Sequence, residues 1–503
     1  MAGKGYASLI KKIVGCGLLI IMVLVTLHDR GSSTPLFSTP MLNLYVILFM
    51  LLALSAFTFG YYKHWRIENL FLLLFIPTGL LFLFIIPPGQ VPDETSHFIR
   101  TYAMSGGGIY DTAAMLPEWL GRWGQPSGMY ELLEASVQVL DETAAIPYSI
   151  GASIFYPPFS YLPQAAGVFI ARLFTSNYFA VYYAGRFVSF AAITATLYFC
   201  IKKMPAGKNL LFAIALMPMF MQEAISLSAD GLALAVIAAD VAFFTFWQEK
   251  NTPLTTKARA LLLLLCMLTL TVKPLYFPFA FLFAFLPQCC FSTKNGKSSA
   301  KLTTLLMVYG GALFTLLAWY IPIYLGGELF VHTAADAGIV DQAAATISNP
   351  LVFLSALANA LMEESEFFFR SLTGYFLWFS VNLPFIFRAM QMVALAVCVT
   401  KDIGLRGPIR AKDRCAMWSF AIASVIVIFL CEYLQWSPVG ENVIYGVQGR
   451  YFLPLLLPVF LAVTGKNSDE CDGAKYPVFY GPPCVMLSIL AISAVFILSG
   501  VTN

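Results

Sequence analysis

Charge is the scarcest property of this sequence. Only 11% of its 503 residues are Asp, Glu, Lys or Arg, whereas ordinary soluble domains carry roughly 25%. A soluble protein of this length needs a charged surface, and the chain lacks the residues for one. The composition therefore excludes a soluble globular protein. The net charge of +3 says little about partners, because basic residues beside membrane helices serve to orient the chain.

Several patterns that would assign a soluble function are also absent. The sequence contains no nucleotide-binding pattern or phosphate loop, no internal repeat and no low-complexity linker. Its ten cysteines lie mainly in or beside apolar runs, so we interpret them as small core residues rather than as a disulfide framework or a metal site. We therefore predict a single integral membrane domain over residues 1–503.

Long apolar runs fill most of the chain, and 59% of the residues are hydrophobic. The 44 Phe and 24 Tyr residues support a membrane protein without indicating a ligand, since aromatic rings fill space between helices and anchor at interfaces. A span needs about 20 apolar residues, so the runs predict an all-α polytopic fold of about 13 transmembrane helices. The predicted spans are 13–29, 42–62, 69–87, 179–201, 209–225, 231–248, 258–272, 275–291, 302–325, 380–400, 415–433, 451–465 and 480–499.

Clusters of Lys and Arg between the runs predict which loops face the cytoplasm, with the N-terminus inside. If all of these clusters are cytoplasmic, residues 156–174 cannot cross the bilayer, and we predict an interfacial or re-entrant helix there. A second such element is expected over 350–375, where the sequence is amphipathic and mixed in charge. The first run, 13–29, is interpreted as a retained helix rather than a signal peptide, because no small-residue cleavage pattern follows it.

The same threading predicts two large outer loops, 88–178 and 326–379. It also brings short polar motifs from distant parts of the chain to the outer face, namely "SLSADGL" (226–232), "VKP" (272–274) and "EYLQWSPVGENVIYGVQGRY" (432–451). Polar residues that converge at a membrane boundary are candidates for a functional site.

The stretch "VPDETSHFIR" (91–100) is the strongest candidate. Asp93 and Glu94 follow Pro92 at the end of a predicted span, and His97 and Arg100 follow at helical spacing, so the four side chains can share one helix face. A carboxylate shielded from water beside an arginine can act as a general base or a metal ligand. The alternative is that the two acids cap a short helix in water.

Other outer-face residues have a functional and a structural interpretation. Asp230 begins a predicted span and can be a helix cap or a site residue. Lys273 and Arg450 lie at the outer boundary; each can extend toward water, or the two can bind an anion such as a lipid phosphate. Tyr156, beside two prolines, can shape the entry of the interfacial helix. The predicted substrate-binding residues are His97, Arg100, Tyr156, Asp230, Lys273, Gln448, Arg450 and Tyr451.

With these motifs in place, the chain resembles a family of bacterial multi-spanning membrane proteins, formerly of unknown function, that is grouped with the C-type (GT-C) glycosyltransferase superfamily. The resemblance rests on motifs in the family's order: "VPDETSHFIR" (91–100), "YPPFSYLPQAAG" (156–167), "GRFVS" (185–189), "SLSADGL" (226–232), "KPLYFP" (273–278) and "GVQGRYFLPLL" (446–456).

The resemblance implies a GT-C-like enzyme that moves a sugar from a polyprenyl-phosphate carrier, such as undecaprenyl phosphate, to an acceptor on the outer side. In that superfamily an acidic residue in the first outer loop is the catalytic base, and Asp93 or Glu94 matches the placement. The chain has no large soluble C-terminal domain, which favours a glycan or lipid-linked acceptor over a protein.

We therefore expect an inverting glycosyltransferase of the bacterial cytoplasmic (inner) membrane, with its active site facing the periplasm or outside. It would decorate a surface polysaccharide such as O-antigen or a teichoic-acid-like polymer, with no certain cofactor and a divalent metal possible. Two alternatives stay open. A glycan polymerase or ligase would use diphosphate donors, and a flippase or transporter would carry ionisable residues at mid-membrane depth and inverted repeats.

Overall fold

The computed structural model describes residues 40–140, 145–292, 300–325, 339–401, 410–463 and 478–502, and it is mostly helical. The predicted span 13–29 and its basic cluster lie outside these residues. The α-helices are α2 (Pro40–Tyr62), α3 (Ile67–Ile85), α4 (Glu94–Ser105), α5 (Leu120–Trp123), α6 (Met129–Ser136), α7 (Leu162–Arg172), α8 (Tyr178–Lys203), α9 (Lys208–Ala215), α10 (Pro218–Ile225), α11 (Ala229–Lys250), α12 (Thr256–Thr271), α13 (Ala300–Leu325), α14 (Ile339–Ser348), α15 (Pro350–Glu363), α16 (Ser365–Thr373), α17 (Phe385–Lys401), α18 (Ala411–Trp436), α19 (Leu453–Val463) and α20 (Gly481–Thr502).

Short 3-10 helices and strands connect these elements. The 3-10 helices are η3 (Gly151–Phe155), η4 (Pro158–Tyr161), η5 (Pro274–Phe285), η6 (Gln288–Phe291) and η8 (Gly449–Phe452). The strands are β1 (Ala113–Pro117), β2 (Ala145–Ser149), β3 (Tyr375–Phe376) and β4 (Val381–Asn382), which form two antiparallel pairs. Such small sheets leave the fold all-α in character.

Six helices of the described chain are long and apolar enough to cross a membrane: α3, α8, α11, α13, α18 and α20. A seventh span results if α14 and α15, which bend by 103° at their junction, count together. Four shorter apolar helices lie within α2, η5, α17 and the η8–α19 segment. An all-α multi-pass membrane protein is thus confirmed, whereas the total of thirteen spans stays a prediction.

Each predicted span from 42–62 onward coincides with a helix or a pair of short helices. The range 451–465 begins in η8 and continues as α19, and two further ranges are also not single α-helices. The range 209–225 breaks into α9 and α10 at Pro218, because a proline disfavours the helical conformation of the residue before it, and Met217 is extended. The range 275–291 forms the 3-10 helices η5 and η6, with Pro274 as the first residue of η5 and Pro278 inside it. Both interruptions follow from proline geometry.

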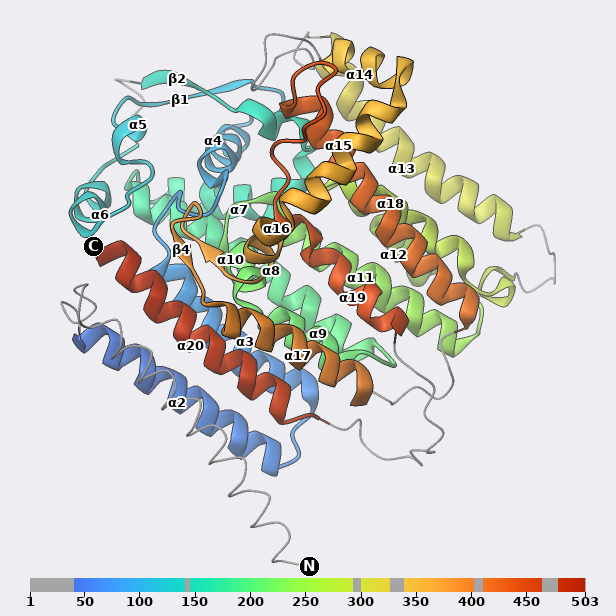
Figure 1. The fold of residues 1–503 in the computed structure, drawn as a ribbon, viewed down its shortest axis with the longest axis horizontal. Coiled ribbons are helices and arrows are strands. Elements are labelled where there is room, and N and C mark those ends of the chain that lie inside the picture. The colour runs from blue at the N-terminus through green and yellow to red at the C-terminus, as the bar shows by residue number, and fades with distance from the viewer. Residues whose placement is uncertain are drawn as a thin grey trace, which may run out of the picture.

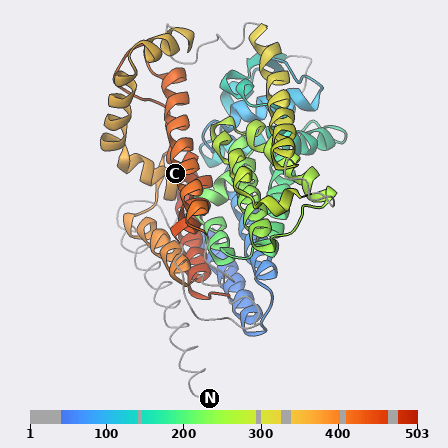
Figure 2. The ribbon, with the colours of Figure 1, turned by 90° about the vertical axis from the view of Figure 1, so that its right-hand side faces the viewer.

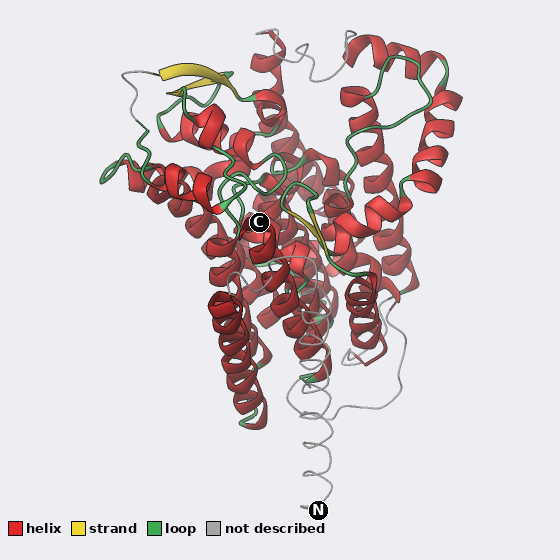
Figure 3. Ribbon diagram, turned by 60° about the vertical axis from the view of Figure 1, so that its left-hand side comes forward, coloured by secondary structure: helices red, strands yellow, loops and turns green. Residues whose placement is uncertain are grey.

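The long helices run roughly side by side, and many of the shorter elements lie toward one end of the molecule (Figure 1). We call this the loop end; it holds α4 to α7, the β1–β2 pair and α14 to α16. The β1–β2 pair covers its margin, with Ala113 opposite Ser149 (Figure 3). Seen from the side, α14 to α16 lie on one flank of the loop end and the elements around α4 on the other (Figure 2).

Helix α11 lies at the centre of the bundle, and 83% of its apolar 18-residue stretch is buried inside the protein. Helix α7 packs closely against α8, and the contact requires glycine: a Cβ on Gly167 would lie 2.3 Å from the backbone oxygen of Ala184. With 11 residues, α7 is about 16 Å long, well short of the roughly 30 Å hydrocarbon core. This length agrees with the predicted interfacial or re-entrant helix, although its position in a bilayer stays a prediction.

Candidate functional site

The predicted acidic pair lies where α3 gives way to α4 at the loop end. Asp93 precedes α4 in a left-handed conformation, with φ of 66°, and its side chain makes no capping hydrogen bond. A non-glycine residue in this region is uncommon and is often found at functional sites. The side chain of Asp93 instead forms an ion pair with Arg450. The capping interpretation therefore does not describe Asp93.

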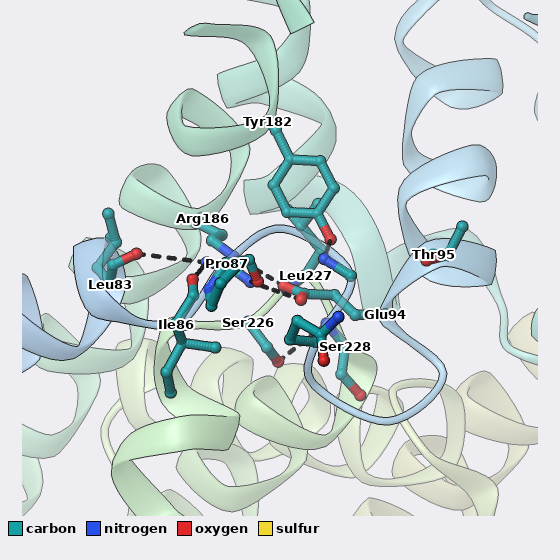
Figure 4. A network of polar contacts seen from close by, with 12 residues as sticks. Leu83, Ile86, Pro87, Glu94, Thr95, Tyr182, Arg186, Ser226, Leu227 and Ser228 are labelled. Carbon is teal, nitrogen blue, oxygen red and sulfur yellow. Dashed lines mark hydrogen bonds and ion pairs between the residues drawn. The ribbon is translucent and has the colours of Figure 1, made fainter. Parts of the chain in front are cut away.

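Glu94 is fully buried and forms an ion pair with Arg186 of α8 (Figure 4). Arg186 donates from Nε to Oε1 at 2.8 Å and from Nη2 to Oε2 at 2.6 Å, which is a bidentate arrangement. Oε1 also accepts the backbone N–H of Leu227 at 3.0 Å. Arg186 further donates to the carbonyl oxygens of Leu83, Ile86 and Pro87. Glu94 thus joins α4, α8 and the α10–α11 turn.

Arg450 of η8 is the centre of a second network, and only 2% of it is exposed. Its Nη1 donates to the carbonyl oxygen of Pro92 at 2.9 Å and lies 3.6 Å from carboxylate oxygens of both Glu223 and Asp230. Its Nη2 binds Asp93 Oδ2. One arginine therefore connects three acids from the start of α4, α10 and α11.

Lys273 supplies the second cation and forms an ion pair with Asp230. The cap of α11 is Ser228, whose hydroxyl accepts the N–H of Asp230 at 3.1 Å, so Asp230 is free to bind Lys273 from the first turn. The Lys273 Nζ lies 4.1 Å from the ring centroid of Tyr451 and 5.8 Å from that of Tyr156. These aromatic faces stabilise the ammonium group.

His97 borders the same network from α4. Its Nδ1 lies 2.7 Å from the hydroxyl of Tyr161, and either group can donate in this hydrogen bond. Burial lowers the pKa of His97 from 6.5 to about 4, although Asp93 and Asp230 oppose the change. His97 is therefore neutral at physiological pH and can donate or accept a single proton.

Besides Glu94, two predicted site residues do not join this network directly. Arg100 is buried beside Trp319 of α13, and its Nη1 is 3.5 Å from the carbonyl oxygen of Asp111. Gln448 is half-buried just before η8, and its buried Oε1 has no hydrogen-bond partner among the described residues. The structure thus brings together Asp93, His97, Tyr156, Asp230, Lys273, Arg450 and Tyr451, and it separates Glu94, Arg100 and Gln448 from them.

The sequence matches the family described as "Predicted membrane protein (DUF2142)" over residues 74–459. The chain belongs to this family. No curated protein and no solved structure matches the chain. The region matched to the DUF2142 family includes every residue of the two networks, from Leu83 to Tyr451. Membership of a family of predicted membrane proteins is thereby confirmed, whereas the grouping of that family with the GT-C superfamily stays a prediction.

Two buried acids of this DUF2142 protein were missed by sequence reasoning. Glu223 of α10 is fully buried beside Arg450, and Glu432 of α18, which is 9% exposed, interacts electrostatically with Lys273, Asp93 and Arg450. Glu223 is the only charged residue between Lys208 and Asp230, and an ionisable residue inside an apolar run is a candidate site residue by itself. Arg186 lies within the motif "GRFVS", but the sequence assigned it no role.

We call Asp93, Glu223, Asp230, Lys273, Glu432 and Arg450 the charged cluster. It contains four carboxyl groups and two cations, and it is drawn from the start of α4, from α10, α11, α18, η8 and the residue before η5. Asp93 is its accessible member, since 44% of its side chain is exposed, compared with 8% for Asp230. Among the described residues, no three His, Cys, Asp or Glu side chains are arranged to hold a metal ion, so we assign no residue to a metal.

Proposed function

We propose that this protein is a membrane glycosyltransferase that moves a sugar from a polyprenyl-phosphate donor to a glycan or lipid-linked glycan acceptor. The observation that carries the proposal is the Asp93 carboxylate: it is half-exposed on one side and held by buried Arg450 on the other. Within the described chain, Arg450 binds Oδ2 and no hydrogen bond reaches Oδ1. A fixed carboxylate with one open oxygen at the edge of an apolar bundle is suited to general-base catalysis.

In the proposed reaction, Asp93 accepts the proton of an acceptor hydroxyl as that oxygen attacks the anomeric carbon of the donor sugar. The new bond forms between the acceptor oxygen and the anomeric carbon, and the bond from that carbon to the phosphate oxygen breaks. Polyprenyl phosphate leaves with the bonding electrons, and the configuration inverts. General-base assistance typically contributes 10² to 10⁴ in rate.

Arg450 and Lys273 are proposed to bind the donor phosphate, since cations at such a site stabilise charge on a leaving group. Both cations pair with carboxylates in the structure, so the phosphate must take over part of these contacts. Arg450 Nε is buried and has no partner among the described residues, which leaves one N–H of Arg450 for a phosphate oxygen. Tyr156 and Tyr451 supply ring faces on which a sugar can stack.

The role proposed for Glu94 differs from that of Asp93. Both oxygens of Glu94 are bonded to Arg186, and one also accepts the N–H of Leu227. Because its lone pairs are engaged and its side chain is buried, we assign Glu94 to positioning and Asp93 to the base. His97 is proposed to orient the acceptor through the nitrogen that does not face Tyr161. The proposed setting is the bacterial cytoplasmic membrane, with the loop end facing outward.

Asp240 favours transport of a lipid-linked sugar as a second candidate function. It is fully buried in the middle of α11 and accepts a hydrogen bond from Thr269 at 2.6 Å, while its Oδ1 has no partner in the described chain. An ionisable residue inside a span is typical of transporters. Ten residues separate Asp240 from Asp230, which is about 15 Å along the helix, so this acid is remote from the charged cluster.

The proposal is tested by complementing a deletion strain with wild-type protein, Asp93→Asn or Glu118→Gln. Glu118 is an exposed acid of the same loop end and serves as the matched control. Mass spectrometry of surface glycans should show a missing sugar restored by wild type and Glu118→Gln, and no restoration by Asp93→Asn at equal protein level. Purified Asp93→Asn that transfers sugar at the wild-type rate would refute the base role.

Transfer and transport are separated with protein in detergent, where no membrane needs to be crossed. A transferase moves sugar from an added polyprenyl-phosphate donor under these conditions, and Asp240→Asn should retain that activity because it keeps the Thr269 hydrogen bond. A transporter shows no transfer in detergent. In that case Asp240→Asn should fail to restore the missing sugar in the deletion strain.

A further inference from the structure

Arg100 and Trp319 form a cluster of hydrogen-bond donors beside the charged cluster. Arg100 lies one turn after His97 on α4 and has no exposed surface, and Trp319 lies near the end of α13 and is 3% exposed. The guanidinium carbon is 5.2 Å from the Trp319 ring centroid. Tyr110 stacks on the same indole at 5.0 Å, which fixes its plane.

The buried donors of this pair lack acceptors. Arg100 Nε, Arg100 Nη2 and Trp319 Nε1 have no hydrogen-bond partner among the described residues. In the described chain, Nη1 reaches the carbonyl oxygen of Asp111 at 3.5 Å, and the carboxylate of Asp111 also interacts electrostatically with Arg100. A buried donor without an acceptor destabilises the fold, more so when it is charged, so three at one place call for an explanation.

The identity of the unpartnered atoms indicates the ligand. Nε and Nη2 lie on the same edge of the guanidinium plane, so their N–H bonds point in parallel and match two oxygens of a carboxylate or phosphate. Trp319 Nε1 adds a third donor and offers no acceptor. A neutral sugar hydroxyl both donates and accepts, whereas an oxyanion only accepts, which matches the three donors that have no partner among the described residues.

We propose that Arg100 and Trp319 bind an oxyanion, a phosphate or carboxylate group carried by the acceptor glycan. This inference rests on the proposed function and names the class of its acceptor as anionic. The donor phosphate is assigned to Arg450 and Lys273, which lie with Asp93. Arg100 lies seven residues from Asp93 along α4, about 10 Å, which is the reach of a short oligosaccharide.

Tyr161 connects the two sites. Its hydroxyl bonds His97 at 2.7 Å, and Arg100 interacts with it electrostatically. An acceptor whose reacting hydroxyl meets Asp93 and whose anion meets Arg100 would therefore lie along His97 and Tyr161. The anion would fix the position of the hydroxyl relative to the base, and the site would select anionic over neutral acceptors.

The test measures ligand binding to the purified full-length protein by thermal shift. The probes are glycerol 3-phosphate and glucuronate, with glycerol and glucose as their uncharged counterparts. The variants are Arg100→Lys, which keeps the charge and loses the parallel fork, and Trp319→Phe, which keeps a ring and loses the N–H. Arg172→Lys is the matched control, since Arg172 also stacks on an aromatic ring but donates to Tyr102 and Ser105.

Wild type should bind both anions and neither neutral counterpart at the same concentration. Arg100→Lys should weaken anion binding about tenfold, or about 1.4 kcal/mol, Trp319→Phe should weaken it severalfold, and Arg172→Lys should leave it unchanged. The same anion binding by wild type and both site variants would overturn the proposal, as would no preference for anions. If Arg100→Lys does not fold, Trp319→Phe carries the comparison.

Two further arms separate the sources of the anion and the two proposals. Nanodiscs with phosphatidylglycerol or phosphatidylcholine, followed by native mass spectrometry, test a lipid headgroup. Phosphatidylglycerol retention that depends on Arg100, without binding of the soluble anions, would overturn the acceptor assignment. Asp93→Asn should still bind the anions, because Arg100 and Trp319 are unchanged. If Asp93→Asn also kept transfer activity while anion binding still depended on Arg100, Asp93 would not be the base and the anion site would still stand.

Discussion

Asp93 and Glu94 are neighbours in the chain, yet the structure gives them different environments. Asp93 is turned by a left-handed backbone toward Arg450 and stays half-exposed, whereas Glu94 is buried against Arg186. A helix-face argument from spacing alone places both acids together. It fails because a left-handed residue redirects its side chain. Spacing contains no signal for that conformation, although Asp is one of the non-glycine residues that adopt it more often than most.

His97 should make stability depend on pH. Its pKa falls from 6.5 when unfolded to about 4 when folded, because it is buried. Above pH 6.5 His97 is neutral in both states and does not reduce the free energy of unfolding. As the pH falls from 6.5 toward 4, the unfolded state binds a proton that the folded state does not, so the free energy of unfolding decreases. The loss is at most about 3 kcal/mol.

The measurement is the melting temperature of the purified protein between pH 7.5 and pH 4.5. His97→Gln cannot titrate and can keep a hydrogen bond to Tyr161, so its melting temperature should fall less over that interval. Identical pH profiles for the variant and wild type would show that His97 does not titrate as described.

At the scale of elements, the ion pair of Glu94 and Arg186 joins α4 to α8 at the point where α10 turns into α11 (Figure 4). Removing one partner of a buried pair leaves a lone buried charge or donor and typically costs about 3–5 kcal/mol. We therefore expect Glu94→Gln and Arg186→Met each to lower the melting temperature strongly. The double variant should be more stable than the sum of the two single changes implies.

A thermal double-mutant cycle in detergent provides the check. Additive effects of the two substitutions would mean that the pair makes no coupled contribution. The cycle also separates Glu94 from catalysis: if Glu94 only positions, a Glu94→Gln protein that remains folded should lose less transfer activity than Asp93→Asn.

The elements themselves were largely predictable from sequence, since apolar runs of sufficient length specify membrane helices. The points at which these helices are interrupted were harder to predict. Pro218 divides one predicted span into α9 and α10, and that division gives Glu223 its place at the end of a short helix beside Arg450. The pairing of Glu223 with a residue more than 200 positions later depends on tertiary packing, which periodicity does not encode.

At the scale of the whole molecule, the predicted orientation puts the loop end outside the cytoplasm. Reporter fusions after Arg172 and after Lys203 test it, because α7 is too short to span and α8 is a candidate span between the two positions. The first fusion should report the outer side and the second the cytoplasm. Cytoplasmic signal at both positions would contradict the orientation from α7 onward.

Positive-inside bias predicted that distant polar motifs would share one face, and in the structure they share one cluster. Asp93, Asp230, Lys273 and Arg450 come from motifs that the sequence analysis had already singled out. Their exact partners were not predictable, because loop-mediated contacts between distant helices carry no local pattern. Arg100 illustrates the limit: it lies on the expected helix, but Trp319 of α13 sets its environment.

The ion pair between Asp93 and Arg450 also constrains how the protein is made. The chain leaves the ribosome from its N-terminus, so Asp93 is synthesised 357 residues before its partner. Arg186, the partner of Glu94, is synthesised only 92 residues after it. The positioning half of the site can therefore assemble while synthesis is under way, whereas the proposed base is held in place only when almost the entire polypeptide has been inserted. A chain released before residue 450 would lack the arginine that holds the proposed base.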